Sequence, residues 1–348
     1  MLNALAFKPL VLERLWEWIC CTRPQERAAG GGYGDADPSL VTLFCLVYNY
    51  RLLTSDHSEF YERQYPFSLA AVREMVGVIK NIVVPLYWTQ DHLSEQQLLL
   101  RNAGTALLSS LLERNCYREF APPMEWQAAD RCIATVVAEL DGSLAARLMS
   151  PDRDEGRGLE PRHQAVLERL PFVLPFALRV RILRHLVALD RRSLADSPHH
   201  WIRCTIKRAR VVEDSYLELN KYGPDLRQTI QVSFINHEGL LEAGIDGGGL
   251  FKEFVNTLSS QAFNPTYGLF CQTAEGLLYP NPQAETAHPW QGSLDHLRLF
   301  EFLGRIVGKA IYDGILVELR LAPFFLRRML GQALHFDDLR SLDPELHK

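Results

Sequence analysis

Residues 243–254 read A-G-I-D-G-G-G-L-F-K-E-F, and this stretch decides the fold of the second half of the chain. Three consecutive glycines permit φ > 0 or the close approach of another backbone, which residues with a Cβ permit poorly. Upstream, apolar and polar residues alternate over 229–235, which is the pattern of a half-buried strand. Downstream, apolar residues recur from Leu250 at the spacing of one helix face. The stretch therefore predicts a strand, a glycine turn and a helix.

Phosphate-binding loops have the same order of elements, but the spacing here does not fit one. A Walker loop ends in Gly-Lys followed by Ser or Thr, whereas two apolar residues follow Gly249. The other Gly-Lys pair, Gly308-Lys309, is followed by alanine, and the glycine before it is one residue too close. A dinucleotide fingerprint requires a glycine where Lys252 stands. Nucleotide binding is therefore not expected.

Five motifs in the same order resemble the N-terminal lobe of HECT-type ubiquitin ligases. They are I-K-R-A-R-V-V-E-D (206–214), the strand at 230–236 with its glycine turn and helix, G-L-L-Y-P-N-P (276–282), F-L-G-R-I-V-G-K-A-I-Y-D-G (302–314) and S-L-D-P-E (341–345). Three further motifs are similar to the subfamily with a long helical region before the HECT domain: L-A-F (5–7), E-F-Y-E-R-Q (59–64) and L-P-F-V-L-P-F (170–176).

The predicted fold is mainly α. Apolar periodicity over residues 1–200 predicts an α-solenoid-like helical array with a polar linker near 150–162. The resemblance implies that this array is the substrate or scaffold region. The resemblance implies that 201–348 form the first part of an α+β HECT N-lobe. In that family the nucleophilic cysteine lies in a separate C-terminal lobe, and the surface for the conjugating enzyme lies late in the N-lobe. Both would lie beyond Lys348, so we expect a chain truncated within the N-lobe and inactive by itself.

Several elements can be placed along the two regions. In the first, Leu12, Leu15, Trp16 and Ile19 lie on one helix face, and Ser68 is an expected N-cap. The second region is expected to contain a strand at 230–236, an extended piece near 269–273 and helices at 212–221, 249–260, 294–318 and 322–331. Helix 294–318 carries Gly304 and Gly308 one turn apart, each costing about 1 kcal/mol relative to Ala. We expect another element to cross close to that ridge in compensation.

Composition excludes several classes of function. A formal net charge of −5 gives no reason to expect a nucleic-acid partner. No apolar run reaches the length of about 18 residues that a bilayer requires, so no membrane association is expected. The seven cysteines form no C-x-x-C pair, and the histidines lack ligand spacing, so neither a metal nor a cofactor is expected. Scattered, unpaired thiols are typical of reduced proteins, which predicts a cytoplasmic location, with the nucleus as the second compartment.

Two candidates for chemistry have stronger structural interpretations. Asp246, which precedes Gly247, Gly248 and Gly249, could position a substrate, but a short acid at a strand-to-helix turn is typical of capping and turn chemistry. Cys271 lies in an apolar, strand-like setting without an adjacent cation, whereas a transfer cysteine needs a lowered pKa. We interpret it as a structural thiol. The chain is therefore expected to contain no catalytic residue.

The turn at Leu277, Leu278 and Tyr279 carries apolar and aromatic groups, which are typical of protein interfaces. The resemblance implies a noncovalent ubiquitin-contact surface near this turn, although an aromatic that often stands earlier in the family is Gly276 here. The alternative is a packed turn without a partner.

The resemblance implies a fragment of a HECT-type ubiquitin transferase. Such an enzyme takes ubiquitin from the thioester of a conjugating enzyme onto its own cysteine, and then passes it to substrate lysines. The expected partners are ubiquitin, a ubiquitin-conjugating enzyme and protein substrates. The alternative is a non-catalytic helical scaffold for protein binding, or a pseudo-ligase.

Overall fold

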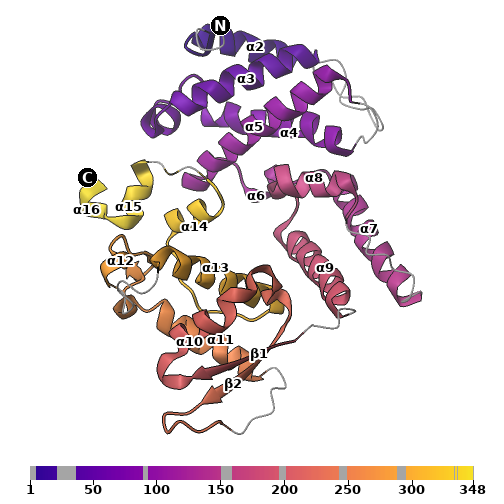
Figure 1. Cartoon of the computed structure of the whole chain (residues 1–348). Helices are drawn as coiled ribbons and strands as arrows, with labels where there is room; N and C mark the ends of the chain where they lie inside the picture. Colours follow the sequence, from indigo (N-terminus) through magenta and orange to yellow (C-terminus); the bar gives the residue numbers. More distant parts are fainter. Residues whose placement is uncertain are drawn as a thin grey trace. The chain divides into compact units, whose positions relative to one another are not determined.

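The computed structural model divides into two compact units, Met1–Leu189 and Asp190–Lys348, and each is described by itself (Figure 1). The sequence had placed this division at 200/201. The structure describes residues 5–21, 37–88, 93–149, 159–195, 201–242, 249–287, 295–332, 334 and 336–347. Of the predicted linker at 150–162, residues 150–158 therefore lie outside the described residues.

The described part of unit 1 is helical. Its elements are α2 (Pro9–Cys21), α3 (Pro38–Thr54), the π-helix η1 (Ser58–Glu62), α4 (Leu69–Trp88), α5 (Glu95–Tyr117), α6 (Pro123–Trp126), α7 (Asp130–Met149), α8 (Pro161–Arg169), the 3₁₀ turn η3 (Pro171–Val173) and α9 (Phe176–Ala195), whose last turn belongs to unit 2. Helix α3 packs between α2 and α5, and α4 packs along the other side of α5 (Figure 1).

Amphipathic periodicity predicts the packing of unit 1 well. The four predicted residues of the first helix, Leu12, Leu15, Trp16 and Ile19, are all buried. The predicted N-cap is also present, since the Ser68 hydroxyl accepts a hydrogen bond from the Ala71 amide at 3.2 Å. These buried faces meet in one hydrophobic core, and most of the stability of such helices comes from this packing.

A glycine determines how closely α4 and α5 approach. A Cβ added at Gly104 of α5 would lie 2.3 Å from Cγ2 of Val83 and 3.4 Å from Cγ2 of Ile79. Both of these α4 side chains are fully buried. Only a residue without a side chain fits here, because protein interiors are close-packed.

Two buried arginines organise the segment after α3. Arg51 pairs with Glu59 of η1. The Nη2 of Arg114, on α5, donates to the carbonyl oxygens of Leu52 at 2.6 Å and Ser55 at 2.7 Å. Arg114 thereby pairs the Ser55 carbonyl and adds a second donor to the Leu52 carbonyl, which already accepts from the Ser55 amide at 3.3 Å. The motif at 59–64 thus contributes to the internal polar packing of unit 1.

Unit 2 combines helices with small sheets, so the chain is mainly α, as predicted. Its further elements are β1 (Trp201–Lys207), η4 (Arg208–Arg210), α10 (Val211–Leu219), η5 (Asn220–Arg227), β2 (Thr229–Ile235), α11 (Gly249–Ala262), η6 (Pro265–Tyr267), β3 (Phe270–Gln272), β4 (Leu278–Pro280), α12 (Ala284–Ala287), α13 (His296–Asp313), α14 (Pro323–Met329), η7 (Phe336–Asp338), α15 (Leu339–Leu342) and α16 (Pro344–His347).

The first sheet is a parallel pair in which Trp201 lies opposite Thr229 and Lys207 opposite Ile235. Parallel strands need a crossover connection, and α10 provides it. Helices α10 and α11 pack beside the two strands and form the core of the unit with them (Figure 1). The second sheet is the antiparallel hairpin β3–β4.

Helix α13 is shorter than predicted. It was expected to continue to residue 318, but it ends where Gly314 adopts φ 70° and caps the helix in the left-handed conformation. Glycine favours this conformation because it has no Cβ. Residues 315–320 have no regular secondary structure, and Leu321 forms a parallel bridge with Leu278 of β4.

The expected close crossing over Gly304 and Gly308 is wrong. A Cβ built at either glycine meets no atom within 4 Å, and both residues are exposed. Unlike Gly104, these two glycines therefore make no room for a neighbour, and their cost in helix propensity is uncompensated by packing.

A polar network fastens the last turn of α9 to the end of α13. Asp190 accepts hydrogen bonds from Arg227 and from the Tyr312 hydroxyl, each at 2.9 Å. Arg191 pairs with Asp313 at 2.8 Å. Because the side chains of Asp190 and Arg191 bond to residues of unit 2, this unit begins structurally before its first strand.

Candidate functional site

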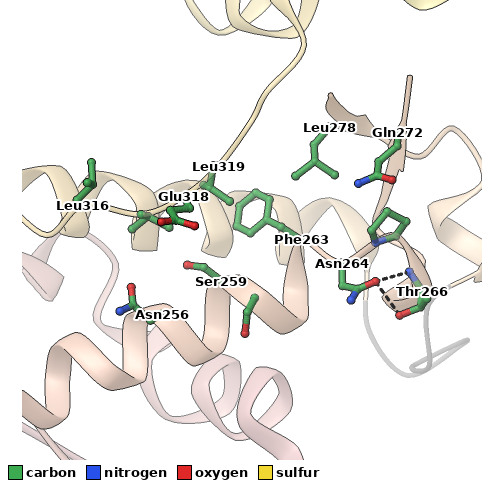
Figure 2. Close-up of a pocket in the computed structure, with 13 residues that line it drawn as sticks. Asn256, Ser259, Phe263, Asn264, Thr266, Gln272, Leu278, Leu316, Glu318 and Leu319 are labelled. Carbon is green, nitrogen blue, oxygen red and sulfur yellow. Dashed lines mark hydrogen bonds between the residues drawn. The ribbon is translucent and has the colours of Figure 1, made fainter. Parts of the chain in front are cut away.

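A groove of about 820 Å³ lies in unit 2 between the end of α11, the β3–β4 hairpin and the extended segment after α13. In Figure 2, Phe263 and Leu319 lie near its middle. Leu316 and Asn256 lie toward one end, and Gln272 and Thr266 toward the other.

Local bonds hold the three sides of this groove together. The ring of Phe263 stacks on Phe270 of β3, with centroids 4.5 Å apart. The Leu278 amide donates to the Arg320 carbonyl at 2.7 Å, and the Ala322 amide donates to the Leu278 carbonyl at 2.8 Å. The extended segment therefore continues the β3–β4 sheet at this point and then diverges along the groove.

The lining of the groove is mixed and nearly neutral. It consists of Asn256, Ser259, Ser260, Phe263, Asn264, Pro265, Thr266, Gln272, Leu278, Leu316, Val317, Glu318 and Leu319. Glu318 is the one ionisable residue in this set. Since Lys, Arg and His are missing from it, the groove has no cation with which to bind a phosphate or another anion.

The predicted ubiquitin-contact turn borders the groove, but most of it is a strand. Leu278 and Tyr279 belong to β4, and Leu278 is only 8% exposed because it packs in the core of unit 2. The Tyr279 ring packs against Phe324, with centroids 5.6 Å apart. Burial raises the pKa of Tyr279, and its interaction with Cys271, which includes a hydrogen bond, raises it further. Leu277 is half-buried. The role of these residues in ubiquitin contact stays a prediction.

Of the predicted glycine turn, only Gly249 is described, as the first residue of α11. Asp246, Gly247 and Gly248 lie outside the described residues. The flanks of the turn are held by Arg208, whose guanidinium reaches Glu242 before the turn and Glu253 after it.

Arg208, in the motif at 206–214, pairs with two acidic residues of unit 2. It contacts Glu253 at 2.8 Å and lies 4.1 Å from the centroid of the Phe234 ring. Hydrogen bonds from its guanidinium to Glu242 and Glu253 raise the pKa of Arg208 further above its ordinary value. Glu253 is thus an ion-pair partner rather than part of an acid–base pair.

All seven cysteines are free thiols, and burial moves two of them away from the reactivity of a transfer nucleophile. Burial raises the pKa of Cys45 to about 12, and burial also raises the pKa of Cys132. Cys271 is half-buried on β3, opposite Tyr279 of β4. A nucleophilic thiol needs the opposite shift, toward a lower pKa.

Within the described ranges, no group of three or more His, Cys, Asp or Glu side chains is arranged to hold a metal ion. The helices of this part of the chain also lack the combination of length and apolarity that crossing a bilayer requires.

Sequence reasoning missed the groove. Asn256, Gln272 and Glu318 come from a helix, a strand and an extended segment that are far apart in the chain, so no motif joins them. One signal in the sequence pointed to it. Gly314 ends α13, so the residues after it do not belong to the helix and can line the groove.

Comparison with known proteins places unit 2 in a family. Residues 256–348 match the family model of the HECT-domain (ubiquitin-transferase). Over 90% of its length, the chain is 34% identical to the E3 ubiquitin-protein ligase UPL6 of Arabidopsis thaliana, of which it covers 31%. Over its full length, it is 30% identical to the human Ubiquitin-protein ligase E3B, of which it covers 33%. It is also 34% identical, over 90% of its length, to the E3 ubiquitin-protein ligase HUL5 of Saccharomyces cerevisiae, of which it covers 39%.

The chain thus spans about a third of the length of the curated relatives that it matches. The matched family segment contains the C-terminal half of α11, the β3–β4 hairpin and α13, which are the elements around the groove. The similarity to the relatives extends through both units. Residues 256–348 therefore carry HECT-domain sequence, and the chain as a whole is similar to E3 ubiquitin-protein ligases over most of its length.

Proposed function

We propose that this chain forms part of a ubiquitin ligase that receives ubiquitin from a conjugating enzyme on a ligase cysteine and transfers it to lysines of protein substrates. The observation that carries the proposal is the match of residues 256–348 to the HECT domain, since these residues form most of unit 2. The names of the relatives that align with both units support the same activity.

We propose that the cysteine that carries ubiquitin is none of the seven cysteines of this chain. A transthiolation nucleophile must be accessible and must ionise readily. Cys45, Cys132 and Cys204 are buried, which opposes both requirements. The role of unit 2 is then to bind and position, while unit 1 provides helical surface for protein substrates.

Ubiquitin is the proposed partner of the turn at Leu277, Leu278 and Tyr279. Tyr279 and Phe324 form an aromatic pair beside the half-buried Leu277. Aromatic groups of this kind are frequent energetic centres of protein interfaces. Neither a cofactor nor a metal takes part in this scheme.

Two measurements with the full chain test the proposal. The chain should bind ubiquitin, and Tyr279→Ala should weaken this binding, while Tyr222→Ala, a half-buried tyrosine elsewhere in unit 2, should not. With activating enzyme, conjugating enzymes and ubiquitin, the chain should form no adduct that a reducing agent removes. An adduct lost on substitution of one of the seven cysteines, or a chain that does not bind ubiquitin, would contradict the proposal.

A further inference from the structure

We propose that the groove between α11, β4 and residues 316–319 binds an extended peptide segment of a partner protein, with an apolar side chain on its floor and a lysine or arginine beside Glu318. This inference goes beyond ubiquitin transfer, because it assigns a second ligand to the groove that the ubiquitin-contact turn borders. It rests on the backbone, the floor and the charge of the groove.

The backbone along one side of the groove is available for hydrogen bonding. The amide groups of Leu316, Val317 and Glu318 donate to no described residue. Leu319 donates to the Val317 carbonyl at 3.0 Å, which turns the chain at Glu318 and leaves the Glu318 carbonyl without a partner among the described residues. An extended peptide recognises such a segment through main-chain hydrogen bonds.

The opposite ends of the groove carry two unused side-chain amides. Asn256 of α11 and Gln272 of β3 are exposed, and neither side chain hydrogen-bonds to a described residue. A primary amide offers both a donor and an acceptor, which matches the two groups of a peptide unit. Figure 2 shows the two residues toward opposite ends of the groove.

The floor and the rim explain why the ligand is a macromolecule. Phe263 and Leu278 are buried and give the floor an apolar character. Leu316, on the rim, is 84% exposed. A small ligand within the groove would leave that side chain in water, whereas a peptide carried by a protein can cover it. Four residues, 316–319, line this side, so the bound segment spans about four residues.

The negative charge of Glu318 determines which charged side chain the bound peptide should carry. Glu318 forms no ion pair among the described residues, and no cation lines the groove. An acidic peptide or a phosphate-bearing ligand would therefore meet an uncompensated carboxylate, while a lysine or arginine would be attracted to it. An exposed pair of this kind changes affinity by up to about fivefold.

The test uses three acetylated, amidated hexapeptides that differ only at position five: Gly-Leu-Gly-Leu-Lys-Gly and its Gln and Glu versions. Fluorescence polarisation with the full chain should rank their affinity as Lys, then Gln, then Glu. Glu318→Lys should reverse that order, and Leu316→Ser should weaken all three. Glu238→Lys, which changes an exposed acid in the turn after β2, should leave the order intact.

Hydrogen exchange separates strand-like binding from simple apolar contact. Saturation with the Lys peptide should slow exchange in the segment 315–321, where the free amides of Leu316, Val317 and Glu318 lie. The proposal is overturned if no peptide binds, if the order is the same in the Glu318→Lys chain, or if the segment stays unprotected. It is also overturned if only ubiquitin, or a second copy of the chain, protects this segment. Ubiquitin binding that persists without peptide binding leaves the proposed ligase function standing.

Discussion

Arg208 holds Glu242 by two guanidinium nitrogens, and Nη2 lies 2.7 Å from Oε2. A two-point contact of this kind fixes geometry as well as charge. The third nitrogen of Arg208 reaches Glu253 of α11. One side chain thus links Glu242, which precedes residues 243–248, to the helix that follows them.

Replacing Arg208 with alanine should loosen this link. We expect a loss of about 1 kcal/mol in the free energy of unfolding of unit 2, because the ion pairs are partly exposed and screened by solvent. Native-state hydrogen exchange of β1 and β2 measures this loss. Arg210→Ala is the matched control, since Arg210 is exposed and has no ion pair in the described structure. Equal losses in both variants would show that the link contributes nothing.

The contribution of the Arg208–Glu242 ion pair to stability should disappear at low pH. Hydrogen bonding from Arg208 lowers the pKa of Glu242 below its ordinary value of 4.5. The stabilisation is therefore complete above the unfolded pKa and is lost as pH falls through the folded pKa. The stability difference between wild type and Arg208→Ala should shrink from about pH 5 to pH 3. A difference that stays constant over this range would exclude the ion pair as its source.

Two glycine-to-alanine substitutions should change the free energy of unfolding in opposite directions. Gly104→Ala forces a Cβ against Val83 in the core of unit 1. Overpacking costs about 1–3 kcal/mol and outweighs the gain of about 1 kcal/mol in helix propensity. Gly308→Ala meets open space and should stabilise α13 by up to about 1 kcal/mol. Urea denaturation of both variants measures the two effects, and a stabilised Gly104→Ala chain would contradict the close approach of α4 and α5.

Lys309 is a buried cation whose removal should be costly. Its Nζ donates to the carbonyl oxygens of Arg227 at 3.1 Å and Gln228 at 2.7 Å, and lies 3.0 Å from Asp313. Burial lowers the pKa of Lys309, and the Asp313 carboxylate opposes that shift.

Lys309→Met leaves the two carbonyls and the carboxylate without this donor, so we expect a loss of about 2 kcal/mol. Lys252→Met removes an exposed lysine of α11 and should change stability by less than about 0.5 kcal/mol. Thermal and urea unfolding of both variants at neutral pH provide the comparison. A neutral Lys309→Met would mean that the methionine packs as well as the bonded lysine does.

Sequence patterns predicted helices more reliably than short extended segments. The stripe of buried residues in α2 is unambiguous at a period of 3.6, and packing then follows. Strand β1 was missed although Ile202, Cys204 and Ile206 alternate with exposed residues, because the basic residues that follow obscure a seven-residue pattern. The segment after Gly314 was read as helix because its leucines and valine also fit a helical face.

The groove could not be predicted for a different reason. Its floor depends on the stacking of Phe263 on Phe270, and its side depends on the pairing of Leu278 with the segment at 320–322. Both are tertiary contacts, and neither changes a local pattern. The resemblance of the motifs to a family indicated which domain was present, but motif order contains no information on which backbone groups stay unpaired.

The hydrogen bonds and ion pair at the end of α9 limit the positions at which two members of the family can recombine. Asp190 and Arg191 are encoded before the first strand of unit 2, yet Arg227, Tyr312 and Asp313 depend on them. A recombination that joined a new helical region at Trp201 would bring foreign residues to these partners and leave them unmatched. Crossovers upstream of Asp190 keep the set together, so natural and engineered chimaeras should have their viable junctions there.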